Sequence, residues 1–218
     1  MENQNKDHSL RGWGSYFINP AAATQNLVEA PHILFDRFTP EIAAQVFLLS
    51  NCWGFLMAGA HRNANGVGSA DVCDPINSIF QVVHQCWSRE RQTTWQIHGF
   101  ANPIEKGFPE NTEIVLSDGR GEISQPIITL EKILEQRGFS SYVYNTLLTD
   151  SALNQKLNGN VAGTTFRPLA ATQNVQSDYN HAINGHFVHI EIESALRTSQ
   201  SNRDKLASAI AESITREL

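Results

Sequence analysis

Short apolar segments alternate with longer segments of helical period along most of the chain, and this alternation restricts the fold more than any other feature. Each apolar segment has the length of a buried strand, and the segments between them repeat apolar residues every three or four positions. Strands are expected at 26–31, 53–58, 94–98, 113–117, 142–145 and 187–193, and helices at 40–49, 76–89, 126–137, 150–157 and 201–218. The pattern predicts a three-layer α/β sandwich around a mostly parallel mixed sheet.

The 218 residues suit a single domain, because no internal repeat, low-complexity tract or long linker divides them. We therefore expect one domain over 1–218, with 1–12 as a flexible N-terminal segment. The cysteines Cys52, Cys73 and Cys86 are odd in number and lack C-x-x-C spacing, which favours buried, reduced thiols.

Charge and hydropathy narrow the range of partners. The formal net charge of −6 argues against binding to nucleic acid or to an acidic membrane surface. No apolar run approaches the ~20 residues of a membrane helix, and the first ten residues are polar, unlike a signal peptide. We expect a cytoplasmic protein with a small-molecule or peptide substrate. Export after removal of a leader stays an open alternative, and the sequence indicates no oligomeric state.

Polar residues stand at or just beyond the ends of several predicted strands, where α/β sheets bind ligands. His32 follows the first strand with Asp36 four residues later, and His98 ends the strand at 94–98. Two histidines and one carboxylate, with an open position for water, form a common catalytic zinc site. We predict a Zn²⁺ ion bound by His32, Asp36 and His98. We expect Thr39 to cap the following helix. The alternative role for Asp36 is that it too caps the start of this helix and binds no metal.

The strand at 187–193 carries two acids, Glu191 and Glu193, among apolar residues. The period of two places both on one face, together with His189. Buried carboxylates are costly without a partner, so these acids indicate a cation, a metal or a proton-transfer role. An edge strand with solvated acids is the alternative.

Four motifs in one order resemble landmarks of the N-formylglutamate amidohydrolase family and, more distantly, of the zinc carboxypeptidases. They are Ala-Pro-His (30–32), Ala-His-Arg-Asn (60–63), Gln-Ile-His-Gly (96–99) and His-Ile-Glu-Ile-Glu-Ser-Ala-Leu-Arg (189–197). The resemblance implies a phosphorylase/hydrolase-like fold, His32 and His98 as zinc ligands, and Glu191 as the catalytic carboxylate. Pro-His is followed here by Ile-Leu-Phe where the family has Ser-Gly, so formylglutamate itself is not implied as the substrate.

Further residues are candidates for contacts with a substrate. Arg62 could stabilise an oxyanion or clamp a carboxylate in a bidentate fork, or it could be an ordinary arginine of a surface loop. Asn63, Arg197 and Glu193 are the other candidates for substrate binding; the family's Asn-Arg pair is reversed here, and Glu193 stands where the family has Asn. Asp71 could orient a ligand histidine through its ring N–H.

These features predict zinc-dependent hydrolysis of an amide or peptide bond in a small carboxylate-bearing substrate, such as an N-acyl amino acid or a peptide. A peptidoglycan or γ-glutamyl amide hydrolase would use the same residues. A non-catalytic α/β binding protein with a relic pocket is the alternative outside enzymes. The sequence contains no P-loop, no dinucleotide fingerprint and no G-x-S-x-G elbow.

Overall fold

The computed structural model describes residues 13–74, 76–106, 108, 110–145 and 169–216. Within them a seven-stranded sheet has the order β1-β3-β2-β4-β7-β5-β6. The strands are β1 (Ser15–Ile18), β2 (Thr24–Ala30), β3 (Cys52–Met57), β4 (Thr93–Phe100), β5 (Ile114–Ser117), β6 (Ser141–Val143) and β7 (His186–Glu193). The central strands β3, β2, β4 and β7 are parallel to one another, whereas β1 pairs antiparallel to β3 and β5 antiparallel to β7. The sheet is therefore mixed and mostly parallel, as predicted.

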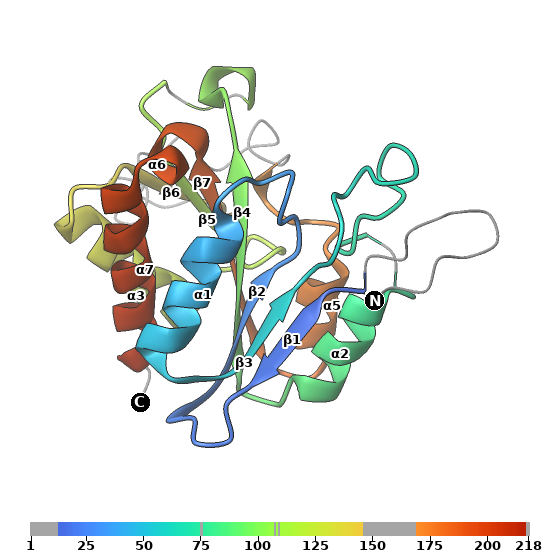
Figure 1. Cartoon of the computed structure of the whole chain (residues 1–218). Helices are drawn as coiled ribbons and strands as arrows, with labels where there is room; N and C mark the ends of the chain where they lie inside the picture. Colours follow the sequence, from blue (N-terminus) through green and yellow to red (C-terminus); the bar gives the residue numbers. More distant parts are fainter. Residues whose placement is uncertain (1–12, 75, 107, 109, 146–168, 217–218) are drawn as a thin grey trace.

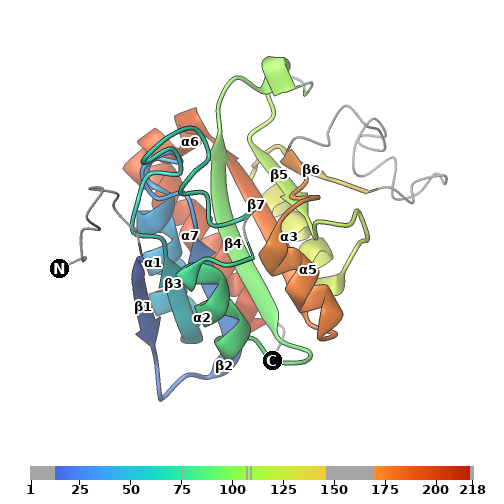
Figure 2. The ribbon, with the colours of Figure 1, turned by 90° about the vertical axis from the view of Figure 1, so that its right-hand side faces the viewer.

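Helices cover both faces of the sheet (Figures 1 and 2). One layer contains α1 (Thr39–Ser50), α3 (Gln125–Gln136) and α7 (Gln200–Thr215), and the other contains α2 (Ile79–Trp87) and α5 (Val175–Ala182). The short helix α6 (Ser194–Thr198) follows β7, and the 3-10 helix η1 (Pro103–Lys106) follows β4. This arrangement confirms the three-layer α/β fold. No helix in the described part of the chain is long and apolar enough to cross a membrane.

The two faces of the central strands differ in chemistry because side chains alternate along a strand. Trp95 and Ile97 of β4 belong to the main hydrophobic core, which α1, α3 and α7 cover. Burial of each such side chain contributes about 1.5–3 kcal/mol. Gln96 and His98 alternate with them and lie on the opposite face, toward α2 and α5. The apolar face therefore holds the sheet together, and the polar face is available for a site.

Several element boundaries differ from the sequence predictions. Strand β4 continues to Phe100, so His98 lies inside the strand and not at its end. Thr39 is the first residue of α1 and not its cap, because Phe38 takes the cap position with a φ of 73°. The elements β1, α5 and α6 were not predicted. The predicted N-terminal segment 1–12 and the predicted helix 150–157 lie outside the described residues.

Gly138 directly follows Arg137, the C-cap of helix α3. This glycine has a φ of +78°, a left-handed conformation that side chains rarely adopt, and no heavy atom would contact an added Cβ. Its N–H donates to the carbonyl of Glu135, and Phe139 N–H donates to Leu134. The turn directs the chain back into β6.

Candidate active site

The register of the central strands brings the predicted functional residues together. His98 of β4 lies directly opposite Glu191 of β7, and Gln96 lies opposite both His189 and Glu29 of β2. His32 follows the end of β2. His32, His98 and Glu191 lie in the carboxyl-terminal part of parallel strands or just beyond it, which is where α/β sheets bind ligands, and Gln96 and His189 lie in the middle of their strands. A cavity of about 940 Å³ opens there, and His32, Asp36, His98, His189, Glu191 and Arg62 are among its lining residues.

Three side-chain atoms converge on one point of the cavity wall. The Nδ1 atoms of His32 and His98 are 3.1 Å apart, and Asp36 Oδ2 lies 3.3 Å from the first and 3.4 Å from the second. Ligand atoms about 2.0–2.2 Å from a tetrahedral zinc ion are separated by about 3.4 Å. The three residues are buried and could hold a metal ion, and their donor set fits zinc.

The outer nitrogen of each histidine has its own hydrogen-bond acceptor. His32 Nε2 lies 2.9 Å from Asp71 Oδ1, and His98 Nε2 lies 2.8 Å from Gln96 Oε1. Metal-binding histidines usually donate their second ring N–H in this way, which leaves the other nitrogen free for the ion. Asp71 thus contacts His32, one of the two predicted metal ligands, and the backbone N–H of Cys73 donates to the same carboxylate oxygen at 2.9 Å.

The pKa values around the three donors reflect their crowding. Burial opposes a charge on His32, but Cys73, Asp36 and Asp71 raise its pKa well above the usual value. Burial likewise opposes ionisation of Asp36, yet its hydrogen bonds to His32 and His98 lower its pKa. Burial lowers the pKa of His98. Two buried carboxylates thus surround His32, and a positive charge at this position compensates them.

The side chain of Asp36 does not cap helix α1. That helix has no side-chain hydrogen bond at its cap, and it is the backbone carbonyl of Asp36 that accepts from Thr39. The carboxylate is free to face His32 and His98 instead. This geometry favours the ligand role of Asp36 over the capping alternative.

Glu191 lies beside the three donors and is almost entirely buried, with 8% of its surface exposed. Its Oε2 atom has no hydrogen-bond partner among the described residues, and its Oε1 atom is 3.7 Å from His189 Nε2. Burial, followed by the charge of Asp36, raises the pKa of Glu191 to about 8. Burial, with His98 and His32, lowers the pKa of His189 well below its usual value, so this imidazole is neutral.

The raised pKa of Glu191 predicts a pH-dependent cost in stability for the metal-free protein. Between pH 4.5, the ordinary pKa, and about pH 8, the folded state keeps a proton that the unfolded state releases. The free energy of unfolding therefore falls as pH rises through this window. Glu191→Gln has no such proton to lose. At about pH 8.5 we expect its melting temperature to exceed that of the wild type by at least ~2–4 °C, the shift that ~1 kcal/mol produces in a domain of this size.

Thermal unfolding of both metal-free proteins across a pH series measures this effect. The gap should shrink toward pH 4.5. A gap that stays constant or grows toward acid pH would show that Glu191 is not held in its protonated form.

Comparison with known proteins supports the fold. No protein-family model and no curated protein matches the chain. Among solved structures, a bacteriophage poly-γ-glutamate hydrolase matches with a TM-score of 0.52 and 16% identity, over 93% of this chain and 87% of that one. A gene product of Agrobacterium tumefaciens matches with a TM-score of 0.51 and 10% identity, over 93% of this chain and 94% of that one. At these identities the likeness shows the fold alone.

Arg62 lines the cavity and is positioned by two neighbours. Its guanidinium forms an ion pair with Asp71 Oδ2, the carboxylate that also accepts from His32. The group also lies over the ring of Phe35, 5.3 Å from its centroid. Because a guanidinium has five N–H donors, the ion pair with Asp71 leaves others for a ligand in the cavity. Its side chain is 31% exposed, so it is accessible from the cavity.

The other predicted substrate contacts are placed differently. Arg197 lines the cavity, but its guanidinium donates to three backbone carbonyls, those of Ile192, Arg37 and Phe100. It packs against Gly99 so closely that a Cβ there would lie 2.3 Å from its Cζ. These contacts tie the turn after β7 to β4. Arg62 is therefore better placed than Arg197 to bind a substrate carboxylate.

Asn63 and Glu193 do not line the cavity in the described structure. The side-chain oxygen of Asn63 accepts from the backbone N–H of Gly68 and stabilises its own loop. Glu193 is the cap of α6, where its carboxylate accepts from Ala195 N–H and from the hydroxyl of Ser194. The prediction that these two residues bind substrate stays a prediction, and in this structure both side chains bond within their own local segments.

Sequence reasoning missed the polar residues directly behind the candidate site. Glu29, Gln96 and His84 are fully buried, and Glu29 bonds to both of the others. The signal was available, since Glu29 and Gln96 are polar residues inside apolar strands, as Glu191 is. His84 lies inside helix α2, where nothing in the local sequence indicates its carboxylate partner Glu29.

Proposed function

We propose that this protein is a zinc-dependent hydrolase of amide or peptide bonds, acting on a small carboxylate-bearing substrate such as an N-acyl amino acid or a peptide. The observation that carries the proposal is the convergence of His32 Nδ1, His98 Nδ1 and Asp36 Oδ2 within 3.1–3.4 Å, beside a buried carboxylate in an open cavity. Zinc bound at such a site acts as a Lewis acid that polarises a carbonyl group and lowers the pKa of water.

Glu191 is the general base in this proposal. It lies close to the donors, since its carboxylate, His98 and His189 have ligand atoms within 4.8 Å of one another. Its free Oε2 atom can accept a proton from the attacking water and return it to the leaving amine. A pKa of about 8 suits a group that must both take and give a proton near neutral pH. A cation close to this carboxylate would lower that pKa and favour the basic form.

Arg62 binds the substrate in this proposal, either at its carboxylate or at the oxyanion that forms during attack. Its ion pair with Asp71 fixes the guanidinium at the cavity wall. Asp71 contacts His32 as well, so the substrate clamp and one proposed metal ligand share a single carboxylate. This link would keep the clamp at a constant position relative to the reacting carbonyl.

Zinc analysis and hydrolysis assays of the purified protein test the proposal. We expect about one equivalent of zinc, loss of hydrolysis after treatment with a chelator, and recovery on adding zinc. The substrate panel should contain N-acyl amino acids, short peptides with a free carboxylate, peptidoglycan fragments and γ-glutamyl amides. The last class is included because the phage enzyme of similar fold is a poly-γ-glutamate hydrolase.

The alternatives predict different results. Hydrolysis of γ-glutamyl amides or peptidoglycan fragments alone would keep the chemistry and change the substrate class. Zinc binding without hydrolysis of any of these substrates would favour a binding protein. Hydrolysis that survives complete removal of metal would overturn the zinc mechanism.

A further inference from the structure

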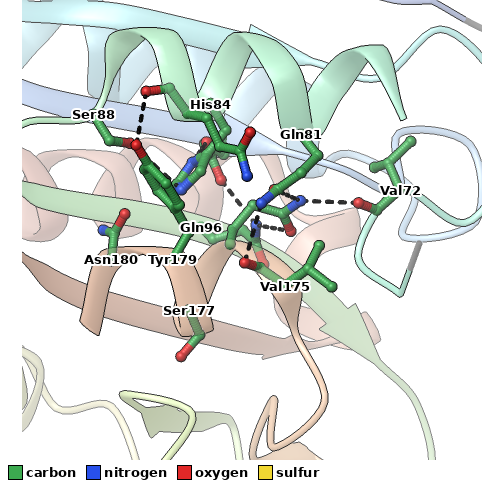
Figure 3. A network of polar contacts seen from close by, with 12 residues as sticks. Val72, Gln81, His84, Ser88, Gln96, Val175, Ser177, Tyr179 and Asn180 are labelled. Atoms are coloured by element: carbon green, nitrogen blue, oxygen red, sulfur yellow. Dashed lines mark hydrogen bonds and ion pairs between the residues drawn. The ribbon is translucent and has the colours of Figure 1, made fainter. Parts of the chain in front are cut away.

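A buried polar network lies between the sheet and the helices α2 and α5, behind the candidate metal site (Figure 3). At its centre Gln96 Oε1 accepts hydrogen bonds from His98 Nε2 at 2.8 Å and from Asn174 Nδ2 at 2.6 Å, and Gln96 Nε2 donates to Glu29 Oε2 at 2.8 Å. Gln96 and Glu29 are 0% exposed. Water therefore cannot replace these contacts, and each partner determines how the next is oriented.

We propose that Gln96 is a positioning residue of the metal site, held by Glu29 and Asn174 so that its carbonyl oxygen fixes the tautomer of His98 that can bind a cation. The inference rests on the metal site of the proposed function. It concerns the metal-free protein as well, because the tautomer of His98 is set before any ion binds.

The orientation of the Gln96 amide follows from what its neighbours can donate and accept. A carboxylate only accepts hydrogen bonds. Glu29 accepts from His84 Nδ1 at 2.7 Å through one oxygen, and its other oxygen must face the amide nitrogen of Gln96. On the far side, Asn174 Oδ1 accepts from the backbone N–H groups of Gln176 and Ser177 as the cap of α5. The amide nitrogen of Asn174 is thereby turned toward the oxygen of Gln96.

The orientation of Gln96 determines which nitrogen of His98 carries the proton. A carbonyl oxygen cannot donate, so His98 must be protonated at Nε2. The neutral ring then has its lone pair on Nδ1, the atom that faces His32 and Asp36. If Gln96 were reversed, its N–H would face Nε2 and the proton would move to Nδ1, where it would block a metal ion.

The two histidines therefore direct Nδ1 toward the proposed metal position by different routes. His32 donates directly to the carboxylate of Asp71. His98 donates to an amide, which could face either way and depends on Glu29 and Asn174 for its direction. This dependence explains why the carboxylate of Glu29 is buried on β2, the strand next to that of His98, although a buried carboxylate is costly.

The first test measures zinc affinity in Gln96→Met, which keeps the length of the side chain but removes both hydrogen-bonding groups. We expect the dissociation constant for zinc to rise about 10–100-fold, the usual effect of losing a partner of a metal-binding histidine. Glu29→Gln keeps the size of the side chain but can donate as well as accept hydrogen bonds. Its dissociation constant for zinc should therefore lie between those of the wild type and Gln96→Met. It carries the test if Gln96→Met does not fold.

Gln176→Met is the matched control. Gln176 is also 0% exposed and belongs to the same network, and it donates to Val72 O and Gln81 Oε1. Its own Oε1 accepts from Gln96 Nε2 at 3.3 Å, but Glu29 holds that nitrogen at 2.8 Å in the variant as well, and the carbonyl oxygen of Gln96, which faces His98, bonds to Asn174 and not to Gln176. We expect a lower melting temperature with unchanged zinc affinity. If Gln96→Met and Gln176→Met weaken zinc binding equally, the network serves stability alone and the inference is overturned.

The second test is the ¹⁵N NMR spectrum of the histidine rings in the metal-free protein, since a protonated and a bare ring nitrogen differ in chemical shift. In the wild type, His98 should carry its proton on Nε2, and Gln96→Met should populate the Nδ1-protonated ring. A wild-type His98 with its proton on Nδ1 would contradict the inference. Failure of the wild type to bind zinc, with the expected change of tautomer present, would overturn the metal proposal and support the role of Gln96.

Discussion

Glu191→Gln should lower kcat by about 10²–10⁴-fold while the protein keeps its zinc. The amide preserves the size of the side chain but cannot accept the proton of the attacking water, and general-base catalysis typically contributes this factor. Substrate binding should change little, because the loss falls on the transition state, so kcat and kcat/KM should fall together. Steady-state kinetics on an active substrate, with zinc content measured on the same samples, checks the result.

Glu193→Gln is the internal control for this experiment. It lies two residues away on the same face of β7, but its carboxylate caps α6 outside the cavity. Weakening a cap costs about 1 kcal/mol of stability and should leave kcat unchanged. The opposite result, with Glu193→Gln inactive and Glu191→Gln active, would move the base by one repeat of the strand. Arg62→Lys separates base from clamp, because loss of the planar fork should lower kcat/KM without changing the zinc content.

Unfolding would not explain a loss of activity in Glu191→Gln. The pKa of about 8 means that the carboxyl group destabilises the folded, metal-free protein above its ordinary pKa, so removing it should raise stability at alkaline pH. An inactive variant that melts at a higher temperature than the wild type is a combination that simple misfolding does not produce.

The convergence of His32, His98 and Glu191 could be predicted because parallel strands end at one edge of a sheet. Strand periodicity also placed His189 on the face of Glu191, and the register of β4 and β7 agrees with it. The place of Asp36 beside these residues could be predicted because it is only four positions from His32 in the sequence. Each of these inferences needs only local sequence and the general geometry of α/β sheets.

The contacts behind the site could not be predicted in the same way. Glu29 and Gln96 meet because β2 and β4 are neighbours, although β3 lies between them in the chain. Sheet order is a property of the whole fold and leaves no local signal. The contacts of Arg197 depend likewise on a space that exists because Gly99 has no Cβ. The sequence predicts that Arg197 is available to bind a substrate. In the folded protein its guanidinium instead donates to backbone carbonyls.

The second large effect is expected from removing a proposed metal ligand. His32→Ala and His98→Ala should each reduce bound zinc to well below one equivalent after dialysis, because a three-residue site loses one of its donors. Elemental analysis of folded protein measures the metal, and circular dichroism confirms the fold. Asp36→Asn should act in the same direction, since an amide oxygen is a much poorer zinc ligand than a carboxylate.

The described residues offer two other groups that could hold an ion, and matched variants distinguish them. One consists of His98, His189 and Glu191, and the other of His32, Asp71 and Cys73. His189→Ala and Cys73→Ser should both retain a full equivalent of zinc if His32, Asp36 and His98 are the ligands.

Zinc lost in His189→Ala and kept in His32→Ala would move the ion to the group of His98, His189 and Glu191. Glu191 would then be a ligand and could not be the general base. Zinc lost in Cys73→Ser and kept in His98→Ala would move it to the second, where a thiolate replaces one imidazole. The donor atoms of His32, Asp36 and His98 already have the spacing that a tetrahedral ion requires, with separations of 3.1–3.4 Å. We therefore expect both control variants to bind zinc as the wild type does.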